Sequence, residues 1–140
     1  MAPPARTYVQ VSKFAVKDLF DPQYKAKLPG IMENCAEKVV KKSAKLTLDQ
    51  PKDKGAKGYT LDGSLVSLGP DKTGKKLGAQ VSLAISTWPG KSIKAMPSGG
   101  GALPIDDISK VDAGDVQAVV EGAVASAMAE AVKYMEKTPP

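Results

Sequence analysis

Two stretches decide the fold: residues 59–68, Tyr-Thr-Leu-Asp-Gly-Ser-Leu-Val-Ser-Leu, and residues 77–87, Leu-Gly-Ala-Gln-Val-Ser-Leu-Ala-Ile-Ser-Thr. In the second stretch apolar and small or polar residues alternate, which is typical of a half-buried β-strand. The turn-rich residues 69–76 join the two stretches, so we predict a hairpin. One face of its second strand is predicted to be core, and the other to meet solvent: Leu77, Ala79, Val81, Leu83 and Ile85 against Gly78, Gln80, Ser82, Ala84 and Ser86.

The remaining chain supplies two helices and two weaker strands. A helix over residues 29–43 and a second over residues 115–137 are predicted from apolar residues recurring at helical spacing. The first strand, residues 7–16, has an imperfect alternation that puts Val9 and Val11 on one face and Tyr8, Phe14 and Val16 on the other. We predict a polar loop over residues 46–58, a short strand over residues 91–96 and a flexible loop over residues 97–104.

This order of elements predicts an α+β fold. A small mixed or antiparallel sheet would form one layer of a two-layer sandwich, with both helices on one face. The first strand should pair beside the hairpin, since two strands alone are marginal. At 140 residues the chain is expected to form one domain, with an extended lead-in over residues 1–6, a core over residues 7–137 and a tail over residues 138–140.

The composition argues against an enzyme. The chain has no histidine and one cysteine, Cys35, which removes histidine-based nucleophilic catalysis and the common zinc sites. Cys35 lies on the apolar face of the first predicted helix and is interpreted as a small core residue. Asp62 is the only carboxylate that we would test for catalysis. We therefore expect no catalytic residues, no metal and no cofactor.

Two motifs have competing interpretations. Residues 98–104 contain three consecutive glycines, but a phosphate-binding loop needs Lys and Ser or Thr next, whereas Ala102-Leu103-Pro104 follows. Asp112 and Asp115 precede the last helix. Their spacing favours capping of free amides over a calcium loop, which needs regularly alternating ligands.

Charge is unevenly distributed along the chain. Residues 1–100 contain 17 Lys and Arg against 8 Asp and Glu, whereas residues 101–140 contain 3 against 7. Such asymmetry can serve contact with acidic surfaces or self-association. A nucleic-acid site is the weaker hypothesis because aromatic residues do not flank the lysines that would form it: Lys52, Lys54, Lys57, Lys72, Lys75 and Lys76.

The exposed hairpin face and its basic tip are the predicted contact surface for a protein partner. The residues that we assign to it are Gln80, Ser82, Ser86, Trp88, Lys72, Lys75 and Lys76. The last helix has a second flank of small residues, which indicates either close packing against the first helix or sheet, or a self-association surface. These residues are Ala118, Gly122, Ser126 and Ala129.

Residues 59–68, residues 80–89 and Asp115-Val116-Gln117 resemble a pattern found in bacterial envelope lipoproteins. Those proteins have a domain like the amino-terminal domain of TolB, and they include outer-membrane activators of penicillin-binding proteins. The resemblance implies a strand-helix-strand-strand-helix core that serves as a non-catalytic adaptor for envelope partners. This chain departs from the pattern because it has no lipobox cysteine near its start.

We therefore expect a non-catalytic protein-binding or assembly domain of the bacterial cell envelope. A structural subunit of a self-assembling particle, such as a phage or a secretion apparatus, is the alternative. Residues 1–6 lack the regions of a signal peptide. The expected location is the periplasm or envelope if a signal segment has been removed, and the cytoplasm if Met1 is the native start. No apolar run is long enough for a transmembrane segment.

Overall fold

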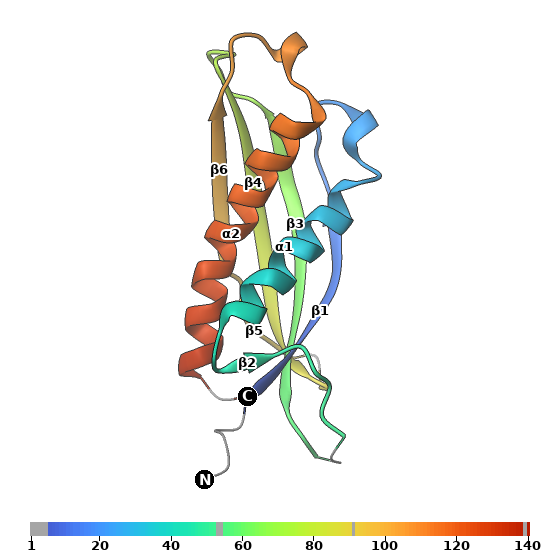
Figure 1. The fold of residues 1–140 in the computed structure, drawn as a ribbon, viewed down its shortest axis with the longest axis vertical. Coiled ribbons are helices and arrows are strands. Elements are labelled where there is room, and N and C mark those ends of the chain that lie inside the picture. The colour runs from blue at the N-terminus through green and yellow to red at the C-terminus, as the bar shows by residue number, and fades with distance from the viewer. Residues whose placement is uncertain (1–5, 53–54, 91, 139) are drawn as a thin grey trace.

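The computed structural model places both helices on one face of a six-stranded mixed sheet, which confirms the predicted α+β sandwich (Figure 1). The structure describes residues 6–52, 55–90, 92–138 and 140; residues 1–5, 53–54, 91 and 139 lie outside the described residues. The elements are β1 (Thr7–Val16), the 3₁₀ helix η1 (Pro22–Tyr24), α1 (Leu28–Lys42), β2 (Leu46–Thr47), β3 (Gly58–Pro70), β4 (Lys76–Trp88), β5 (Ile93–Ala95), β6 (Ser98–Pro104), the 3₁₀ helix η2 (Ile108–Lys110) and α2 (Ala113–Lys137).

The predicted hairpin is confirmed and is longer than expected. β3 and β4 pair antiparallel from Gly58 opposite Trp88 to Pro70 opposite Leu77. Gly74 takes a positive φ of 72° in the tight turn between them, a conformation that glycine adopts without steric cost. The predicted inner face of β4 is buried at all five positions. This face carries the helices, and we call the opposite face of the sheet the outer face.

β1 pairs parallel with β3, as expected for a strand that lies beside the hairpin. The predicted division of its side chains is wrong, because the register shifts between Val11 and Phe14. A bulge of this kind reverses which residues face the core. As a result Phe14 is 4% exposed and its ring lies against Gly63 of β3.

The predicted loop over residues 46–58 is partly wrong. Leu46 and Thr47 form β2, which pairs parallel with the start of β1. The backbone N–H of Thr7 donates to the carbonyl of Lys45 at 2.9 Å. Leu46 is 1% exposed, so burial of one leucine accounts for a strand that the polar sequence around it does not indicate.

The predicted flexible loop over residues 97–104 is wrong as well. Its residues form β6, which pairs antiparallel with β4 from Lys76 opposite Pro104 to Ser82 opposite Ser98. The short predicted strand is confirmed as β5, which pairs with β4 at Ile85 and Ser86. Because β5 and β6 both pair with β4, they share one edge of the sheet.

Glycine explains why β6 is a strand without the usual β-formers. A Cβ on Gly101 would stand 2.6 Å from the carbonyl oxygen of Val119 and 2.9 Å from the nitrogen of Ala123. A Cβ on Gly99 would meet the backbone of α2 in the same way, 2.9 Å from the carbonyl oxygen of Ala123. The helix therefore lies directly on the backbone of β6.

Both helices end close to their predicted limits. α2 begins with the predicted capping box: the N–H of Asp115 donates to the carboxylate of Asp112 at 2.9 Å, and the reverse bond measures 3.2 Å. α1 and α2 bury aliphatic side chains against the sheet and each other, consistent with the low aromatic content. No helix in the described ranges is both long and apolar enough to cross a bilayer.

Candidate functional site

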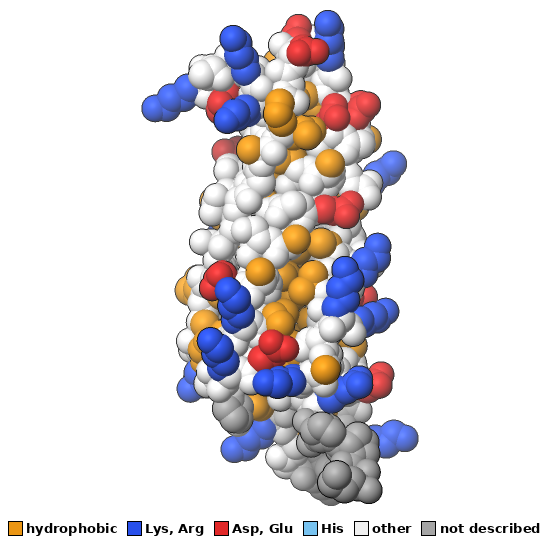
Figure 2. All heavy atoms as spheres, turned by 60° about the vertical axis from the view of Figure 1, so that its left-hand side comes forward, with side chains coloured by type: hydrophobic (Ala, Val, Ile, Leu, Met, Phe, Trp, Pro, Cys, Tyr) orange, Lys and Arg blue, Asp and Glu red, His pale blue; other side chains and the backbone are white. Residues whose placement is uncertain are grey.

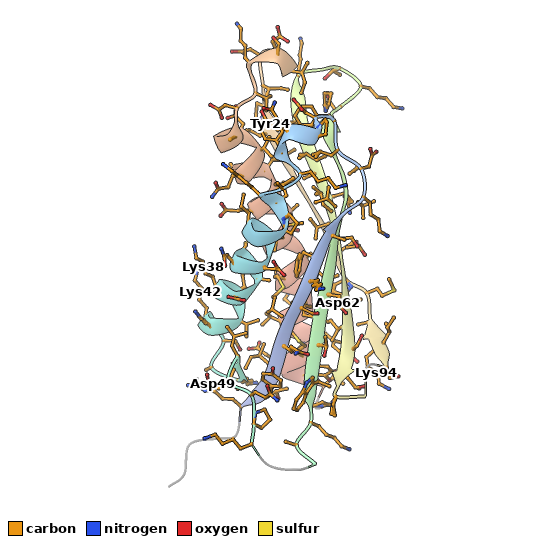
Figure 3. The ribbon with its side chains drawn as sticks, turned by 90° about the vertical axis from the view of Figure 1, so that its right-hand side faces the viewer. Tyr24, Lys38, Lys42, Asp49, Asp62 and Lys94 are labelled. Atoms are coloured by element: carbon orange, nitrogen blue, oxygen red, sulfur yellow. The ribbon has the colours of Figure 1, made fainter. Side chains whose placement is uncertain are left out.

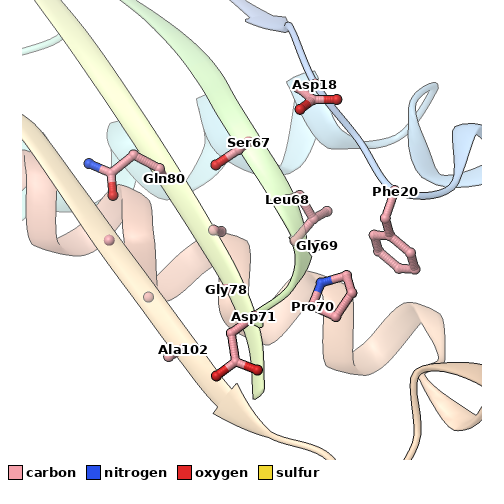
Figure 4. A pocket seen from close by; sticks show the side chains of 13 residues that line it. Asp18, Phe20, Ser67, Leu68, Gly69, Pro70, Asp71, Gly78, Gln80 and Ala102 are labelled. Atoms are coloured by element: carbon pink, nitrogen blue, oxygen red, sulfur yellow. The ribbon is translucent and has the colours of Figure 1, made fainter. Parts of the chain in front are cut away.

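The outer face of the sheet contains an open groove of about 670 Å³ across β3, β4 and β6 (Figure 4). No helix covers it, because α1 and α2 both lie on the other face. The floor consists of residues with small side chains and one glutamine: Ser67, Gly69, Gly78, Gln80, Gly100 and Ala102.

The groove exists because neighbouring positions of three strands have no side chain or only a methyl group. Gly78 pairs with Gly69 on one side and with Ala102 on the other. A Cβ on Gly78 would meet nothing nearer than 3.8 Å. Glycine inside a strand weakens the sheet and often marks a place where another backbone or a ligand approaches closely.

Phe20 and Pro70 line one side of the groove, as Figure 4 shows. Phe20 is held there because its N–H donates to the carbonyl of Leu68 at 2.9 Å. Asp18 and Asp71 add carboxylates to the lining. The hydroxyl of Thr73 donates to Asp71 at 2.7 Å and lowers the pKa of that carboxyl. The groove thus combines a bare floor, an apolar wall, one amide and two carboxylates.

The predicted contact residues do not form one surface. Gln80 is exposed and lies in the groove, and Ser82 is half-buried on the same face of β4. Ser86 is only 5% exposed, so its predicted exposure is wrong. The tip lysines Lys72 and Lys75 are exposed in the β3–β4 turn, and Lys76 is exposed at the start of β4.

An aromatic pair occupies the other end of the outer face. Tyr8 and Trp88 both pair with Gly58, one from each side, and their rings meet edge to face with centroids 4.7 Å apart. Trp88 lies two residues beyond Ser86 on the same face of β4, and Thr60 beside Ser86 is 4% exposed. This half of the face is closed, in contrast to the groove.

The lysines of the nucleic-acid hypothesis lie at opposite ends of the molecule. Lys52 and Lys57 precede β3, whereas Lys72, Lys75 and Lys76 follow it. β3 has 13 residues and therefore separates the two groups by roughly 40 Å. Lys54 lies outside the described residues. The described lysines of this weaker hypothesis therefore do not form one patch.

Asp62 and Cys35, which the sequence analysis considered for catalysis, are both half-buried. Asp62 is half-buried on the outer face, opposite Ala84 (Figure 3). Cys35 is half-buried against the core, and its Sγ–H donates to the carbonyl of Glu121 at 3.7 Å. Burial, followed by the charge of Glu121, raises the pKa of the Cys35 thiol. Among the described residues, no group of three His, Cys, Asp or Glu side chains could hold a metal.

The small residues of α2 are exposed at all four positions: Ala118, Gly122, Ser126 and Ala129. An added Cβ on Gly122 would meet no atom within 4 Å. The predicted packing of these side chains against the first helix or the sheet is therefore wrong. The close approach to β6 uses the backbone of α2 and the glycines of the strand instead.

The groove residues Phe20 and Pro70 and the glycine floor were not predicted from the sequence. The sequence feature that could have indicated the groove is a set of glycines at outward-facing strand positions: Gly69, Gly78 and Gly100. Two of these lie in or beside the predicted hairpin, where they could have been noted as sites of close approach. Gly100 could not, because its strand was expected to be a loop.

No protein-family model matches this chain, and no curated protein matches it. Solved bacterial structures share its fold. Protein XCC0632 of Xanthomonas campestris, assigned to DUF330, has a TM-score of 0.60 at 15% identity, covering 98% of this chain and 94% of that one. The PelC dodecamer of Paraburkholderia phytofirmans has a TM-score of 0.53 at 14% identity, covering 89% and 90%. The hypothetical protein CT253 of Chlamydia trachomatis has a TM-score of 0.56 at 10% identity, covering 94% and 96%. At these identities the likeness concerns the fold alone.

Proposed function

We propose that this chain is a non-catalytic protein-binding and assembly domain of the bacterial cell envelope, whose partner docks in the outer groove. The observation that carries the proposal is the uncovered floor of Gly69, Gly78, Gly100 and Ala102 beside the apolar wall of Phe20 and Pro70. A floor made mostly of glycine leaves room for a large apolar side chain of a partner, and the Gln80 amide can orient the partner's backbone.

The envelope location is supported by the sequence resemblance to envelope lipoproteins and by the bacterial source of the structures with this fold. The finer likeness to TolB-like domains and to activators of penicillin-binding proteins stays a prediction from the sequence. The non-catalytic role is supported by the absence of histidine from the chain. Turnover of a substrate that was lost on Asp62→Ala would contradict this role.

The experiment fills the groove without disturbing the fold. Gly78→Val adds a β-branched side chain to a strand at a position where an added Cβ has room. Ala84→Val is the matched control, because Ala84 lies on the same strand and the same face but does not line the groove.

A photo-crosslinking residue at Gln80 provides the readout in a bacterial host that exports the chain. We expect a discrete crosslinked protein from Gln80 that Gly78→Val removes and Ala84→Val retains. A crosslinker at the exposed residue Lys38, on the helix side of the molecule (Figure 3), should not capture this protein. Capture of the same protein from both positions, or indifference to Gly78→Val, would count against the groove.

Self-assembly is the second candidate function. The exposed small residues of α2 favour it, since such a surface lets another helix approach closely. The dodecameric state of PelC, which shares the fold, supports the same candidate. In that case the partner is a second copy of this chain.

A further inference from the structure

Cationic side chains gather at one end of this elongated molecule. Figure 2 shows many Lys and Arg spread over the lower half of the visible face with fewer Asp and Glu among them, while the upper end carries charges of both signs. We call the lower end the basic end and define it by the exposed residues in the last helical turns, in the adjoining connections and in β5: Arg6, Lys41, Lys42, Lys45, Lys52, Lys57, Lys94 and Lys137.

Hydrogen bonds bring these separate segments together. Thr7, which follows Arg6, donates to the carbonyl of Lys45. The hydroxyl of Tyr59, two residues after Lys57, donates to the carbonyl of Thr138 at the end of α2. The hydroxyl of Ser43 donates to the carboxylate of Glu136 at 2.7 Å, which joins the ends of the two helices.

Few carboxylates balance this charge. Among the described residues, the carboxylates at this end are Asp49, Glu136 and, one turn before Lys41 on α1, Glu37; Glu136 already accepts from Ser43. Within the described ranges, the one ion pair joins Lys133 to Glu130 at 3.8 Å; it lies one turn before Lys137 on α2 and includes none of the eight cations of the basic end. The cations of the basic end are therefore available for a partner.

Helix electrostatics explain only some of these cations. Lys41, Lys42 and Lys137 lie in last helical turns, where positive charge is favourable. Arg6, Lys45 and Lys57 precede strands, and strands have only small net dipoles. Nothing in the fold of this end requires their charge.

Exposed apolar side chains accompany the charge. Ile93 is 60% exposed and Met96 is 66% exposed, and Lys94 lies between them in the chain. Trp88, the only tryptophan of the chain, is half-buried nearby at the end of β4. Basic, apolar and tryptophan side chains together are typical of proteins that lie on the bilayer interface.

The chemistry favours a lipid surface over a nucleic acid. Seven of these eight cations are lysine, a point charge that suits diffuse attraction, whereas a single arginine offers little bidentate recognition. The large groove of the molecule lies near the opposite end, lined by Asp18 and Asp71, so the basic charges do not surround it. Because these positive charges are spread over one end of the molecule, they are complementary to an extended anionic surface.

We propose that the basic end binds the surface of a bilayer rich in anionic phospholipid, with Ile93 and Met96 entering the headgroup region. The long axis would then project away from the bilayer and hold the outer groove roughly 30 Å from it, given about 3.3 Å per strand residue. This inference is independent of whether a protein occupies the groove, because the two sites share no residue.

Vesicle flotation tests the proposal with the full chain. We expect binding to phosphatidylcholine vesicles that contain about 30% of the anionic lipid phosphatidylglycerol, and no binding to vesicles of pure phosphatidylcholine. Binding should weaken strongly between 0.05 M and 0.5 M salt, since salt screens surface charge. A blue shift of Trp88 emission on binding would place this end at the lipid.

The decisive comparison uses two charge-reversed triple variants with the same change in net charge. Lys45→Glu with Lys57→Glu and Lys94→Glu alters the basic end, and Lys72→Glu with Lys75→Glu and Lys76→Glu alters the tip of the hairpin. All six lysines are exposed, and circular dichroism melts check that both variants fold. The first triple should lower vesicle binding at least about 100-fold, because loss of each lysine charge alone costs roughly fivefold, and the second less than about threefold.

Three outcomes would overturn the proposal. The first is no binding of the wild type to anionic vesicles at low salt, and the second is an equal loss for the two triple variants. The third is that the wild type binds an oligonucleotide at the same salt concentration, and that the basic-end variant loses this oligonucleotide binding but keeps its vesicle binding. An Ile93→Asn, Met96→Gln variant should in addition remove the binding that persists at high salt, and its retention would contradict the apolar contact.

Discussion

A side-chain carbon on Gly101 would stand 2.6 Å from the carbonyl oxygen of Val119, a separation that the packed structure does not permit. This relationship makes the glycines of β6 a requirement of the fold, because α2 rests on the strand's backbone. The same strand carries Gly100 on its outer face, where it contributes to the floor of the groove. One glycine run thus serves helix packing with one face and the candidate site with the other.

Gly101→Ala should therefore destabilise the protein by about 2–4 kcal/mol, since α2 must shift away from the sheet. The matched control is Gly100→Ala, where the new Cβ would stand 3.1 Å from the flexible Gln80 side chain and should cost less than about 1 kcal/mol. Urea denaturation measures both changes. Equal destabilisation by the two substitutions would show that α2 does not rest on this strand.

Asp112→Ala should cost about 1 kcal/mol, because it removes the acceptor for the N–H of Asp115 at the start of α2. Asp106→Ala is the control: Asp106 is an exposed neighbour in the preceding connection and caps no helix in the structure. Thermal unfolding followed by circular dichroism distinguishes the two. A loss of stability that is the same for both would attribute the effect to charge and not to the cap.

Thr73→Val should raise the pKa of the Asp71 carboxyl toward its ordinary value, because the Thr73 hydroxyl is the main cause of its lowering. A carboxyl with a lowered folded pKa contributes stability that is present above its unfolded pKa. That contribution is lost as the pH falls through the lowered folded value. Carboxyl carbon NMR titration of Asp71 measures the shift, and an unchanged titration in the variant would assign the lowering to the backbone alone.

Gly122→Lys should prevent assembly if α2 associates with a second copy through its small residues. Gly122 has no atom within 4 Å of an added Cβ, so the isolated fold can accept the longer side chain. Gln117→Lys, an exposed position of the same helix, controls for added charge. Light scattering at several salt concentrations reports the mass. A wild-type chain that stays monomeric at high micromolar concentration would remove this candidate function.

Local patterns were sufficient for part of this molecule. The alternation of residues 77–87 identified β4 and its buried face, and the Asp112–Asp115 spacing identified the cap of α2. Both depend on interactions between residues that are near each other in the chain or on the period of a single strand. Such signals survive in the sequence whatever the rest of the chain does.

Contacts between distant segments decided the rest. Residues 98–104 form an ordered strand because the backbone of α2 packs directly on them. The side-chain directions of β1 depend on a bulge, which only the pairing of β1 with β3 defines. Likewise, lysines at residues 52–57 and 72–76 are close in the sequence, but the length of β3 carries them to opposite ends. The sequence by itself determined the hairpin, the helices and the α+β class. Only the tertiary structure decided the groove and the basic end, because each is assembled from side chains that belong to separate elements.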